Sequence, residues 1–541
     1  MLLQESKVMG CRAGQLKRLR LVADGPELFV YFDDMTTPVL REFDDTYNRP
    51  GRAGLWKDHR GTGTFDNVSI DDAKPDPKRQ PPSRVDWSWV RGAVYVRSNA
   101  VNAVQMWADY WPHVDVVDRE LSDAQRYGFN MVQVYLHWIA WDGLGADEYL
   151  KRIDDFVARA EKHGLKVNFV LWDDCGHVEP SLDFAAPVPG RHNSQMMPNP
   201  SHKIRDNVGL FALHEPRFRA YVTGVAAHFK NDGRIAFWQL YNEPMGPPTK
   251  YRDGVADTNL NRLIELTREC VKSAGATQPV TATGGAFYGP KYSDFYSFHS
   301  YSDGTFALPG ADGGPDHLCT ETLNRPGSDV HKCLRELAGK RTGFVVWELM
   351  IGRDNCRFPW GHPDGPAEPA VPFHGVLFPD GHPWSVDEMH ALLGDEKFAA
   401  LQRSCFDVDY FDGRFETSKK KSITPRVDFD LGDEPGTGSP DITAGVGRDH
   451  FSIRWTGHFA ASRNETRTFA CSGDGEMSLK IDDQTVVSKS SNQPEATGTA
   501  TLVAGKTYRV TIEYVHTTGP ARAKVQTVID GKTTVFTLPT K

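Results

Sequence analysis

An apolar run that ends in Asn-Glu-Pro carries the strongest chemical signal in this sequence. Residues 237–241 read as a buried strand, and Asn242, Glu243 and Pro244 follow them directly. Because proline cannot donate to a sheet ladder, the strand must end there. An amide and a carboxylate therefore stand at its carboxyl end, where barrels of alternating strands and helices carry their chemistry. A carboxylate in that place suits general acid/base work on a glycosidic bond, with an ordinary surface turn as the alternative.

This stretch resembles the acid/base motif of the retaining glycoside hydrolases built on TIM barrels, a clan that includes cellulases, mannanases and β-galactosidases. Within that clan the sequence is most similar to glycoside hydrolase family 5. The resemblance implies that Glu243 is the acid/base and that Asn242 hydrogen-bonds the sugar 2-hydroxyl. Gln133 stands where many clan members carry an arginine, which is a departure from the best-known cellulases.

A retaining mechanism needs a second carboxylate as nucleophile, about 5–5.5 Å from the first. Glu321 and Glu348 compete for that role, because Glu321 ends the strand candidate 317–321 and Glu348 lies within the strand candidate 344–349. If Glu321 ends the seventh strand, residues 328–340 supply the seventh helix and residues 344–349 the eighth strand. Residues 320–326 also resemble the Thr-Glu ending of that strand in the clan, so we favour Glu321 and keep Glu348 as the alternative.

Further residues are expected around the sugar. His299 and Tyr301 form a His-x-Tyr pair that period two places on one face of the sixth strand. The resemblance implies that this tyrosine orients the nucleophile and that Trp347 lies under the sugar. We expect the remaining contacts from polar and aromatic residues at strand ends and in loops, namely His137, Asp173, Glu348 and Trp360. A metal at the Asp173-Asp174 pair is the weaker interpretation, since no histidine cluster accompanies it.

The elements that must position these residues alternate between strand and helix. Helical spacing of apolar residues is seen in 147–163, 217–229 and 259–274. Eight strand candidates over about 320 residues fit a (β/α)8 barrel, and they are residues 90–96, 130–137, 166–172, 235–242, 279–283, 295–301, 317–321 and 344–349. Long loops at 175–216 and 352–372 are expected to wall the site.

Composition divides the chain into three regions. We expect a partial jelly-roll-like β segment at residues 1–70, the catalytic barrel at 87–412 and a β-sandwich at 441–541 that resembles a PA14 domain. Polar linkers are expected at 71–86 and 413–440. The fold class is thus α/β, a TIM barrel with all-β accessory domains.

Bulk properties limit the possible partners. A net charge of -9 argues against a nucleic-acid partner, and the absence of an 18-residue apolar run argues against a membrane span. The eight cysteines show neither CxxC pairs nor regular spacing, so neither zinc nor a disulfide framework is indicated. No signal peptide is evident at the N-terminus. An extracellular or periplasmic location is therefore expected only from the polysaccharide-type domains. The oligomeric state is open.

Together these patterns predict a retaining glycoside hydrolase that cleaves β-glycosidic bonds in oligo- or polysaccharides and needs no metal or organic cofactor. Two alternatives stay open. One is a transglycosylase on the same fold, and the other is a non-catalytic carbohydrate-binding protein. The identity of the sugar is not predicted.

Overall fold

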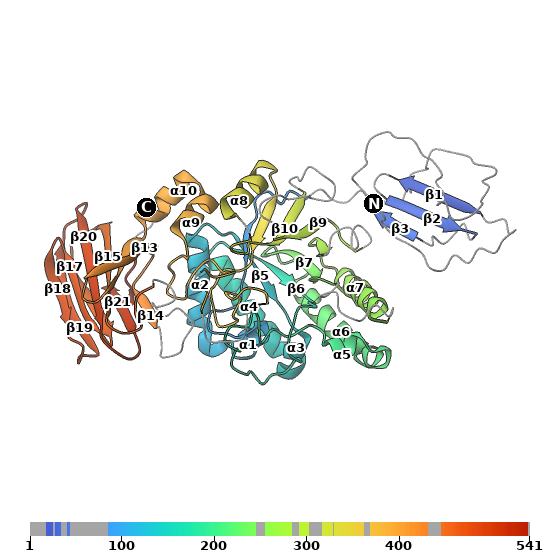
Figure 1. Cartoon of the computed structure of the whole chain (residues 1–541), viewed down its shortest axis with the longest axis horizontal. Coiled ribbons are helices and arrows are strands. Elements are labelled where there is room, and N and C mark those ends of the chain that lie inside the picture. The colour runs from blue at the N-terminus through green and yellow to red at the C-terminus, as the bar shows by residue number, and fades with distance from the viewer. Residues whose placement is uncertain are drawn as a thin grey trace.

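An eight-stranded parallel sheet forms the centre of the molecule (Figure 1). The computed structural model describes residues 18–24, 27–33, 40–43, 85–244, 255–283, 292–301, 316–327, 329–361, 368–369, 371–430 and 445–538. The sheet strands are, in chain order, β4 (Arg91–Val94), β5 (Met131–Tyr135), β6 (Lys166–Val170), β7 (Ile235–Tyr241), β8 (Val280–Ala282), β9 (Tyr296–Ser300), β10 (His317–Thr322) and β11 (Gly343–Val346). All eight predicted strands are present. Their spatial order is β8-β7-β6-β5-β4-β11-β10-β9, and every paired neighbour is parallel.

The two end strands of this order, β8 and β9, meet through side chains. The hydroxyl of Thr281 lies 2.8 Å from that of Ser297 and donates to the carbonyl of Phe295 at 3.3 Å. The sheet thereby closes into the TIM barrel that the sequence predicted. Buried residues occupy every position of β5 and β11, as expected for strands covered on both faces.

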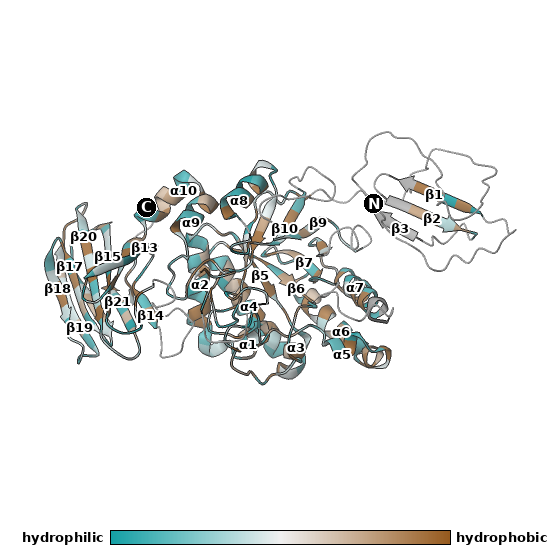
Figure 2. Ribbon diagram, viewed as in Figure 1, coloured by the Kyte–Doolittle hydropathy of each residue, from teal (hydrophilic) through white to brown (hydrophobic). Residues whose placement is uncertain are grey.

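Helices cover the outside of the barrel (Figure 1), and they carry both apolar and polar residues (Figure 2). In α4 the predicted apolar positions Tyr149, Ile153 and Phe156 are fully buried, while acidic residues open the helix and basic residues end it. The helices are α1 (Ala103–Ala108), the 3-10 helix η1 (Trp111–His113), α2 (Val114–Arg126), α3 (Trp138–Leu144), α4 (Ala146–Lys162), α5 (His202–Arg205), α6 (Val208–Phe229), α7 (Val255–Ser273), α8 (Val330–Gly339), α9 (Val386–Leu393) and α10 (Asp395–Arg403).

The predicted loop at 175–216 is shorter in the structure. The helix α6 begins at Val208 and contains Pro216, which we had placed before the helix. Asn207 caps this helix, because its side-chain oxygen accepts the amide of Leu210 at 2.9 Å. Because of this cap, the helix begins before Pro216 and includes it. The proline has no N–H, so the helix lacks one backbone hydrogen bond there.

A two-sheet sandwich follows the barrel, and it begins earlier than predicted. One sheet has the order β13-β12-β15-β20-β17-β18, and the other β14-β21-β16-β19 with β22 beside β21. The strands are β12 (Phe406–Asp412), β13 (Thr417–Thr424), β14 (Asp428–Asp430), β15 (Phe451–Ala460), β16 (Glu465–Gly473), β17 (Glu476–Ile481), β18 (Gln484–Lys489), β19 (Glu495–Leu502), β20 (Thr507–His516), β21 (Arg522–Ile529) and β22 (Lys532–Val535).

The predicted linker at 413–440 is therefore wrong over residues 417–430, which form β13 and β14, and the predicted end of the barrel at 412 assigned β12 to the wrong unit. The error has a physical cause. The strand β13 lies at the edge of its sheet, where charged residues are favoured because they discourage further pairing. Its run Lys419 to Lys421 resembles a linker only in composition.

The N-terminal region contributes a three-stranded antiparallel sheet of β1 (Leu19–Asp24), β2 (Glu27–Phe32) and β3 (Leu40–Phe43). Asp24 pairs with Glu27 across the turn between β1 and β2. The other segments that suggested a jelly roll lie outside the described residues. None of the helices in the described ranges has the length and apolar composition that a bilayer span requires.

Candidate active site

Two glutamates and a histidine meet at the carboxyl ends of three barrel strands. Glu243 follows β7, the fourth strand of the barrel, whereas Glu321 lies in β10, the seventh. His299 of β9 is the register partner of Glu321 in the neighbouring strand. One carboxylate oxygen of each glutamate and one ring nitrogen of His299 lie within 4.8 Å of one another. This separation matches the close pair of a retaining glycosidase rather than the wider pair of an inverting one.

Glu321 is held by two phenolic hydroxyls. Tyr135 donates to its Oε1 at 2.9 Å, and Tyr301 donates to its Oε2 at 2.7 Å. The side chain is only 5% exposed. Two hydrogen-bond donors fix the orientation of the carboxylate and favour its ionised form, which is what a nucleophile requires.

The side chain of Glu243 is more exposed than that of Glu321, and it is held by His299 and Cys175. Its carboxylate contacts His299 Nδ1 at 2.8 Å and accepts a hydrogen bond from the Cys175 thiol at 3.0 Å. The side chain is 41% exposed. Its backbone has a φ of 45°, a left-handed conformation that non-glycine residues rarely adopt and that often marks functional sites.

The pKa values of the three groups are coupled. Burial acts to raise the pKa of Glu243, but the hydrogen bond and charge of His299, with the Cys175 thiol, outweigh it and lower that pKa to about 2. Burial raises the pKa of Glu321 to about 7, against the opposing charge of His299 and the tyrosine hydrogen bonds. The pKa of His299 is raised, because the two carboxylates outweigh its burial.

These directions describe a resting state with an imidazolium between carboxylates. An acid/base residue must instead be protonated when it meets the glycosidic oxygen. The two states differ by one proton shift along the 2.8 Å contact from His299 Nδ1 to Glu243. A sugar that covers the exposed side of Glu243 removes water from it and so favours its neutral form.

Asn242 is fixed beside the carboxylates. Its side-chain nitrogen donates to Asp173 Oδ1 at 3.0 Å, and its oxygen accepts from Gln239 at 2.9 Å. Asp173 also accepts the backbone amide of Cys175 at 3.1 Å. The side chain of Asp173 thus positions both Asn242 and the loop that carries the thiol.

Other predicted sugar ligands have partners within the protein. The Nδ1 atom of His137 accepts the amide of Ile139 at 3.2 Å as a helix cap, and Nε2 lies 3.3 Å from the carbonyl of Pro198. Because burial lowers the pKa of His137 to about 3, its ring is neutral and donates from Nε2. Asp174 forms a buried ion pair with Arg205 at 2.6 Å. Both residues serve as structural supports of the site.

Two tryptophans lie near the carboxylates. The Trp347 ring packs edge-on against Tyr135, with centroids 5.8 Å apart. Trp360 packs against Tyr301 at 5.3 Å and is 55% exposed. An exposed ring beside a nucleophile-holding tyrosine offers a platform for a sugar.

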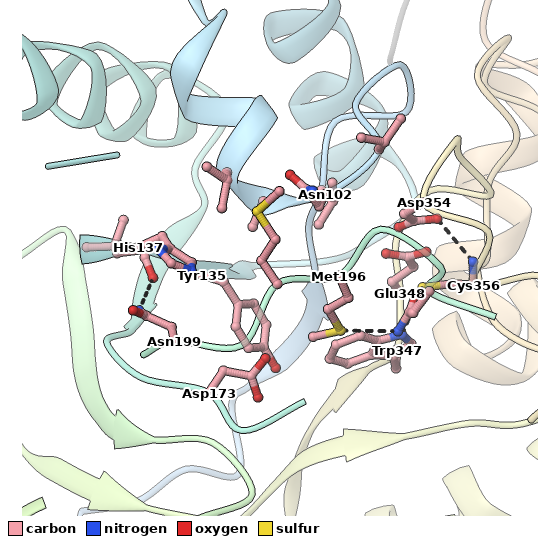
Figure 3. Close-up of a pocket in the computed structure, with 17 residues that line it drawn as sticks. Asn102, Tyr135, His137, Asp173, Met196, Asn199, Trp347, Glu348, Asp354 and Cys356 are labelled. Carbon is pink, nitrogen blue, oxygen red and sulfur yellow. Dashed lines mark hydrogen bonds between the residues drawn. The ribbon is translucent and has the colours of Figure 1, made fainter. Parts of the chain in front are cut away.

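A hollow lined by Tyr135, Asp173, Trp347 and Glu348 lies next to these residues (Figure 3). Tyr135, His137 and Asp173 lie toward one end of it, and Trp347, Glu348, Asp354 and Cys356 lie together at the other. Since Glu348 follows β11, the eighth strand, the barrel places Glu321 and not Glu348 on the seventh.

Sequence reasoning missed Tyr135 and Cys175. A signal for Tyr135 existed, because period two places it on the same strand face as Gln133 and His137. The position of Cys175 depends on how the loop after β6 folds over the end of β7. No local pattern in the sequence encodes that contact.

Comparison with known proteins agrees with this geometry. Residues 101–326 match the family described as cellulase, glycosyl hydrolase family 5, and residues 402–535 match the PA14 domain. The probable mannan endo-1,4-beta-mannosidase A of Aspergillus oryzae is 28% identical over 290 residues, which are 47% of this chain and 68% of that protein.

Two further similarities are partial. The anti-sigma-I factor RsgI3 of Acetivibrio thermocellus is 34% identical over 105 residues, 19% of this chain and 15% of that protein. The structure of β-mannanase from the blue mussel Mytilus edulis covers 48% of this chain and 85% of its own, at 14% identity and a TM-score of 0.34.

Proposed function

Because its barrel belongs to glycosyl hydrolase family 5, this chain is a retaining β-glycoside hydrolase, and we propose that its substrate is a β-linked mannan. The mannan assignment is supported by the A. oryzae relative, whose printed name is that of a mannan endo-1,4-beta-mannosidase. The C-terminal sandwich is a PA14 domain, so the chain joins a catalytic barrel to an accessory β domain.

We propose that Glu321 attacks the anomeric carbon. As its oxygen bonds to that carbon, the glycosidic C–O bond breaks and Glu243 gives its proton to the leaving oxygen. In the second step the Glu243 carboxylate removes a proton from water. The water oxygen bonds to the anomeric carbon, and the ester bond to Glu321 breaks.

Neighbouring residues support each step. Tyr135 and Tyr301 hold Glu321 in line and stabilise its charge before attack. Asn242 is held beside Glu243 by Asp173 and Gln239, and its side-chain nitrogen has a second hydrogen to offer a sugar hydroxyl at the reacting carbon. His299 holds the proton that Glu243 needs, at 2.8 Å.

One observation carries this assignment, namely the arrangement of the two glutamates. Glu321 is buried, accepts two tyrosine hydroxyls and has one oxygen within 4.8 Å of a Glu243 oxygen. Glu243 remains 41% exposed, where a leaving group or water can reach it. A buried nucleophile beside an accessible acid is the asymmetry that double displacement needs.

The test is hydrolysis of β-1,4-mannan, cellulose and a panel of aryl β-glycosides by the wild type and four variants, namely Glu243→Ala, Glu321→Ala, Glu348→Gln and Glu348→Ala. We expect Glu243→Ala and Glu321→Ala to lose at least about 10³-fold in kcat/KM. Azide should restore turnover in both, giving a β-glycosyl azide with Glu243→Ala and an α-glycosyl azide with Glu321→Ala. Glu348→Gln should retain an azide-independent activity.

Two outcomes would contradict the proposal. If Glu348→Gln were inactive and Glu348→Ala were rescued by azide while Glu321→Ala still turned over, the nucleophile would be Glu348. If cellulose or aryl glucosides were cleaved and mannan were not, the family assignment would stand and the mannan assignment would fail.

We further propose that the enzyme acts outside the cytoplasm, since polymeric glycans are too large to enter cells intact. Fractionation of the native host with an antibody to the chain would test this. Recovery of the protein only from the cytosol would contradict it.

A further inference from the structure

Behind the Trp347 ring lies a second cluster of buried acidic and sulfur groups that the glycosidase mechanism does not use. It consists of Glu348, Asp354 and Cys356, and all three side chains are buried. One ligand atom of each lies within 4.8 Å of the others. Figure 3 shows the carboxyl groups of Glu348 and Asp354 next to each other at one end of the hollow.

The buried Glu348 carboxyl group lies beside the Asp354 carboxyl group and the Cys356 thiol, and neither neighbour supplies a positive charge. The residue is 1% exposed, and neither of its oxygens has a hydrogen-bond partner within the described ranges. Such a group is costly to bury, because desolvation of a charge must be offset by pairing or by a cation. The unpartnered oxygens face the hollow, which has a cavity volume of about 40 Å³.

The cation whose charge acts on Asp354 is already paired with another carboxylate. Arg357 acts on Asp354, but its guanidinium forms two hydrogen bonds with Glu368, at 2.7 and 2.9 Å. The remaining Arg357 nitrogen donates to the carbonyl of Gly352 and to Asn355. The positive charge of Arg357 is therefore largely neutralised by Glu368 and does little to offset the charges of Glu348 and Asp354.

We propose that Glu348, Asp354 and Cys356 bind a structural zinc ion, with a fourth position filled from the hollow. Two carboxylates supply the charge that a divalent ion balances. A thiolate is a preferred ligand of zinc and a poor one for magnesium or calcium. Metal binding would also remove the thiol proton, as it does in other cysteine sites. This inference concerns a site separate from the catalytic glutamates and does not rest on the proposed substrate.

The zinc site would stabilise the sugar platform. The indole nitrogen of Trp347 donates to Cys356 Sγ at 3.3 Å, and Trp347 directly precedes Glu348 in the chain. A metal bound through both residues 348 and 356 would fix the loop that turns behind the ring. Outer contacts of this kind are known to orient ligands and neighbouring groups around metals.

Metal content of the full chain, purified without a histidine tag, is the first measurement. After dialysis against trace zinc, mass spectrometry should find about one zinc per chain in the wild type. Glu348→Gln and Cys356→Ser should each retain less than a tenth of that. Cys471→Ser is the matched control, because it removes a buried thiol from the C-terminal sandwich and leaves the cluster intact.

Cobalt provides a readout that does not depend on activity. Co²⁺ added to the metal-stripped wild type should give a thiolate-to-cobalt charge-transfer band, which Cys356→Ser abolishes and Cys471→Ser retains. Zinc should raise the thermal unfolding midpoint of the wild type and leave that of Glu348→Gln unchanged. Circular dichroism spectra matching the wild type would exclude misfolding as the cause.

Two results would overturn the proposal. One is a wild type with neither zinc nor the cobalt band after incubation with each metal, which would mean that the two carboxyl groups share a proton instead. The other is unchanged metal binding in both Glu348→Gln and Cys356→Ser, which would assign the ion to other residues.

Discussion

At the scale of residues, the active site is a cluster of three titratable groups, Glu243, Glu321 and His299, which share a small number of protons. In the proposed mechanism Glu321 must be ionised to attack, and Glu243 must be neutral to protonate the leaving oxygen. With His299 neutral and Glu243 protonated, the net charge is the same as with an imidazolium and a carboxylate. The contact of 2.8 Å between them allows that exchange without any proton entering from solvent. Titration therefore belongs to the cluster rather than to one residue.

The first prediction concerns pH. Because the pKa of Glu321 is raised to about 7, kcat/KM should fall as the pH drops through that value and the nucleophile becomes protonated. It should also fall at alkaline pH, when the proton shared by His299 and Glu243 is lost. A bell-shaped profile of kcat/KM with its maximum above neutrality is expected. A profile that stays flat down to pH 5 would show that Glu321 is ionised far below its expected range.

Tyr301→Phe tests whether protonation of Glu321 causes the fall in kcat/KM on the acidic side of the profile, its acidic limb. Removing the hydroxyl deprives the ionised form of Glu321 of a 2.7 Å hydrogen bond, so its pKa should rise and the limb should move to higher pH. Hydrogen bonds to charged groups contribute about 1.5–3 kcal/mol, so kcat/KM at the optimum should fall about 10- to 100-fold. Tyr31→Phe in the N-terminal sheet is the control and should leave the profile unchanged.

Cys175 allows a second test of the cluster. The thiol donates to Glu243 at 3.0 Å and so stabilises its ionised form. In Cys175→Ala the pKa of Glu243 should therefore rise, moving the alkaline limb of kcat/KM to higher pH, and activity should fall about tenfold. Cys175→Ser keeps a hydroxyl donor and should stay near the wild type. Equal losses in both variants, with no movement of the limb, would give the thiol a packing role only.

The sequence could predict some of these residues and not others. Glu243 and Glu321 follow apolar strands, so their meeting depends only on the barrel being formed. Contacts such as that of Cys175 with Glu243 depend on the path of a loop that has no period of its own. The same holds for Glu348, which lies after an apolar strand as Glu321 does but faces a separate cluster behind Trp347.

At the scale of elements, apolar runs bounded by turn residues were sufficient to predict every barrel strand. The strands are buried on both faces, so their sequences are unusually apolar and easy to distinguish. The sequence did not predict strand β13 for the opposite reason, since an edge strand with exposed lysines has the composition of a linker. Burial, rather than strand propensity, decided which elements could be recognised.

The strand β11 offers a test of how tightly the barrel is packed. A Cβ atom added at Gly343 would lie 2.2 Å from the backbone carbonyl oxygen of Trp87, which cannot move aside as a flexible side chain can. Gly343→Ala should therefore lower the free energy of unfolding by about 1–3 kcal/mol. Urea denaturation followed by tryptophan fluorescence measures this change.

Gly339 in α8 is the matched control for that substitution. Among the described residues, no atom outside its own stretch of the helix lies within 4 Å of the position that its Cβ would take, and alanine favours the helix. Gly339→Ala should leave stability unchanged or raise it by up to about 1 kcal/mol. If both alanine variants behaved alike, the close contact at Gly343 would not limit the barrel.

At the scale of the whole molecule, the barrel and the sandwich share a buried ion pair. Arg426, between β13 and β14, forms two hydrogen bonds with Asp123 of α2, one of them Nη2 to Oδ2 at 2.6 Å. The two side chains are 6% and 1% exposed. Tyr127 of the same barrel segment donates to Gly381, whose loop also contacts the sandwich. The two units are therefore expected to unfold together.

Removing one member of this pair should separate the two units. Asp123→Ala leaves a buried guanidinium without its partner, which typically destabilises a protein by about 3–5 kcal/mol. Differential scanning calorimetry should show one transition for the wild type and two for Asp123→Ala. The double variant Asp123→Leu/Arg426→Met removes both charges, so it should recover much of the lost stability.

Glu476→Ala is the control, because it breaks an exposed pair with Arg414 and should change the free energy of unfolding by no more than about 0.5 kcal/mol. A single unshifted transition in Asp123→Ala would mean that apolar packing alone couples the units.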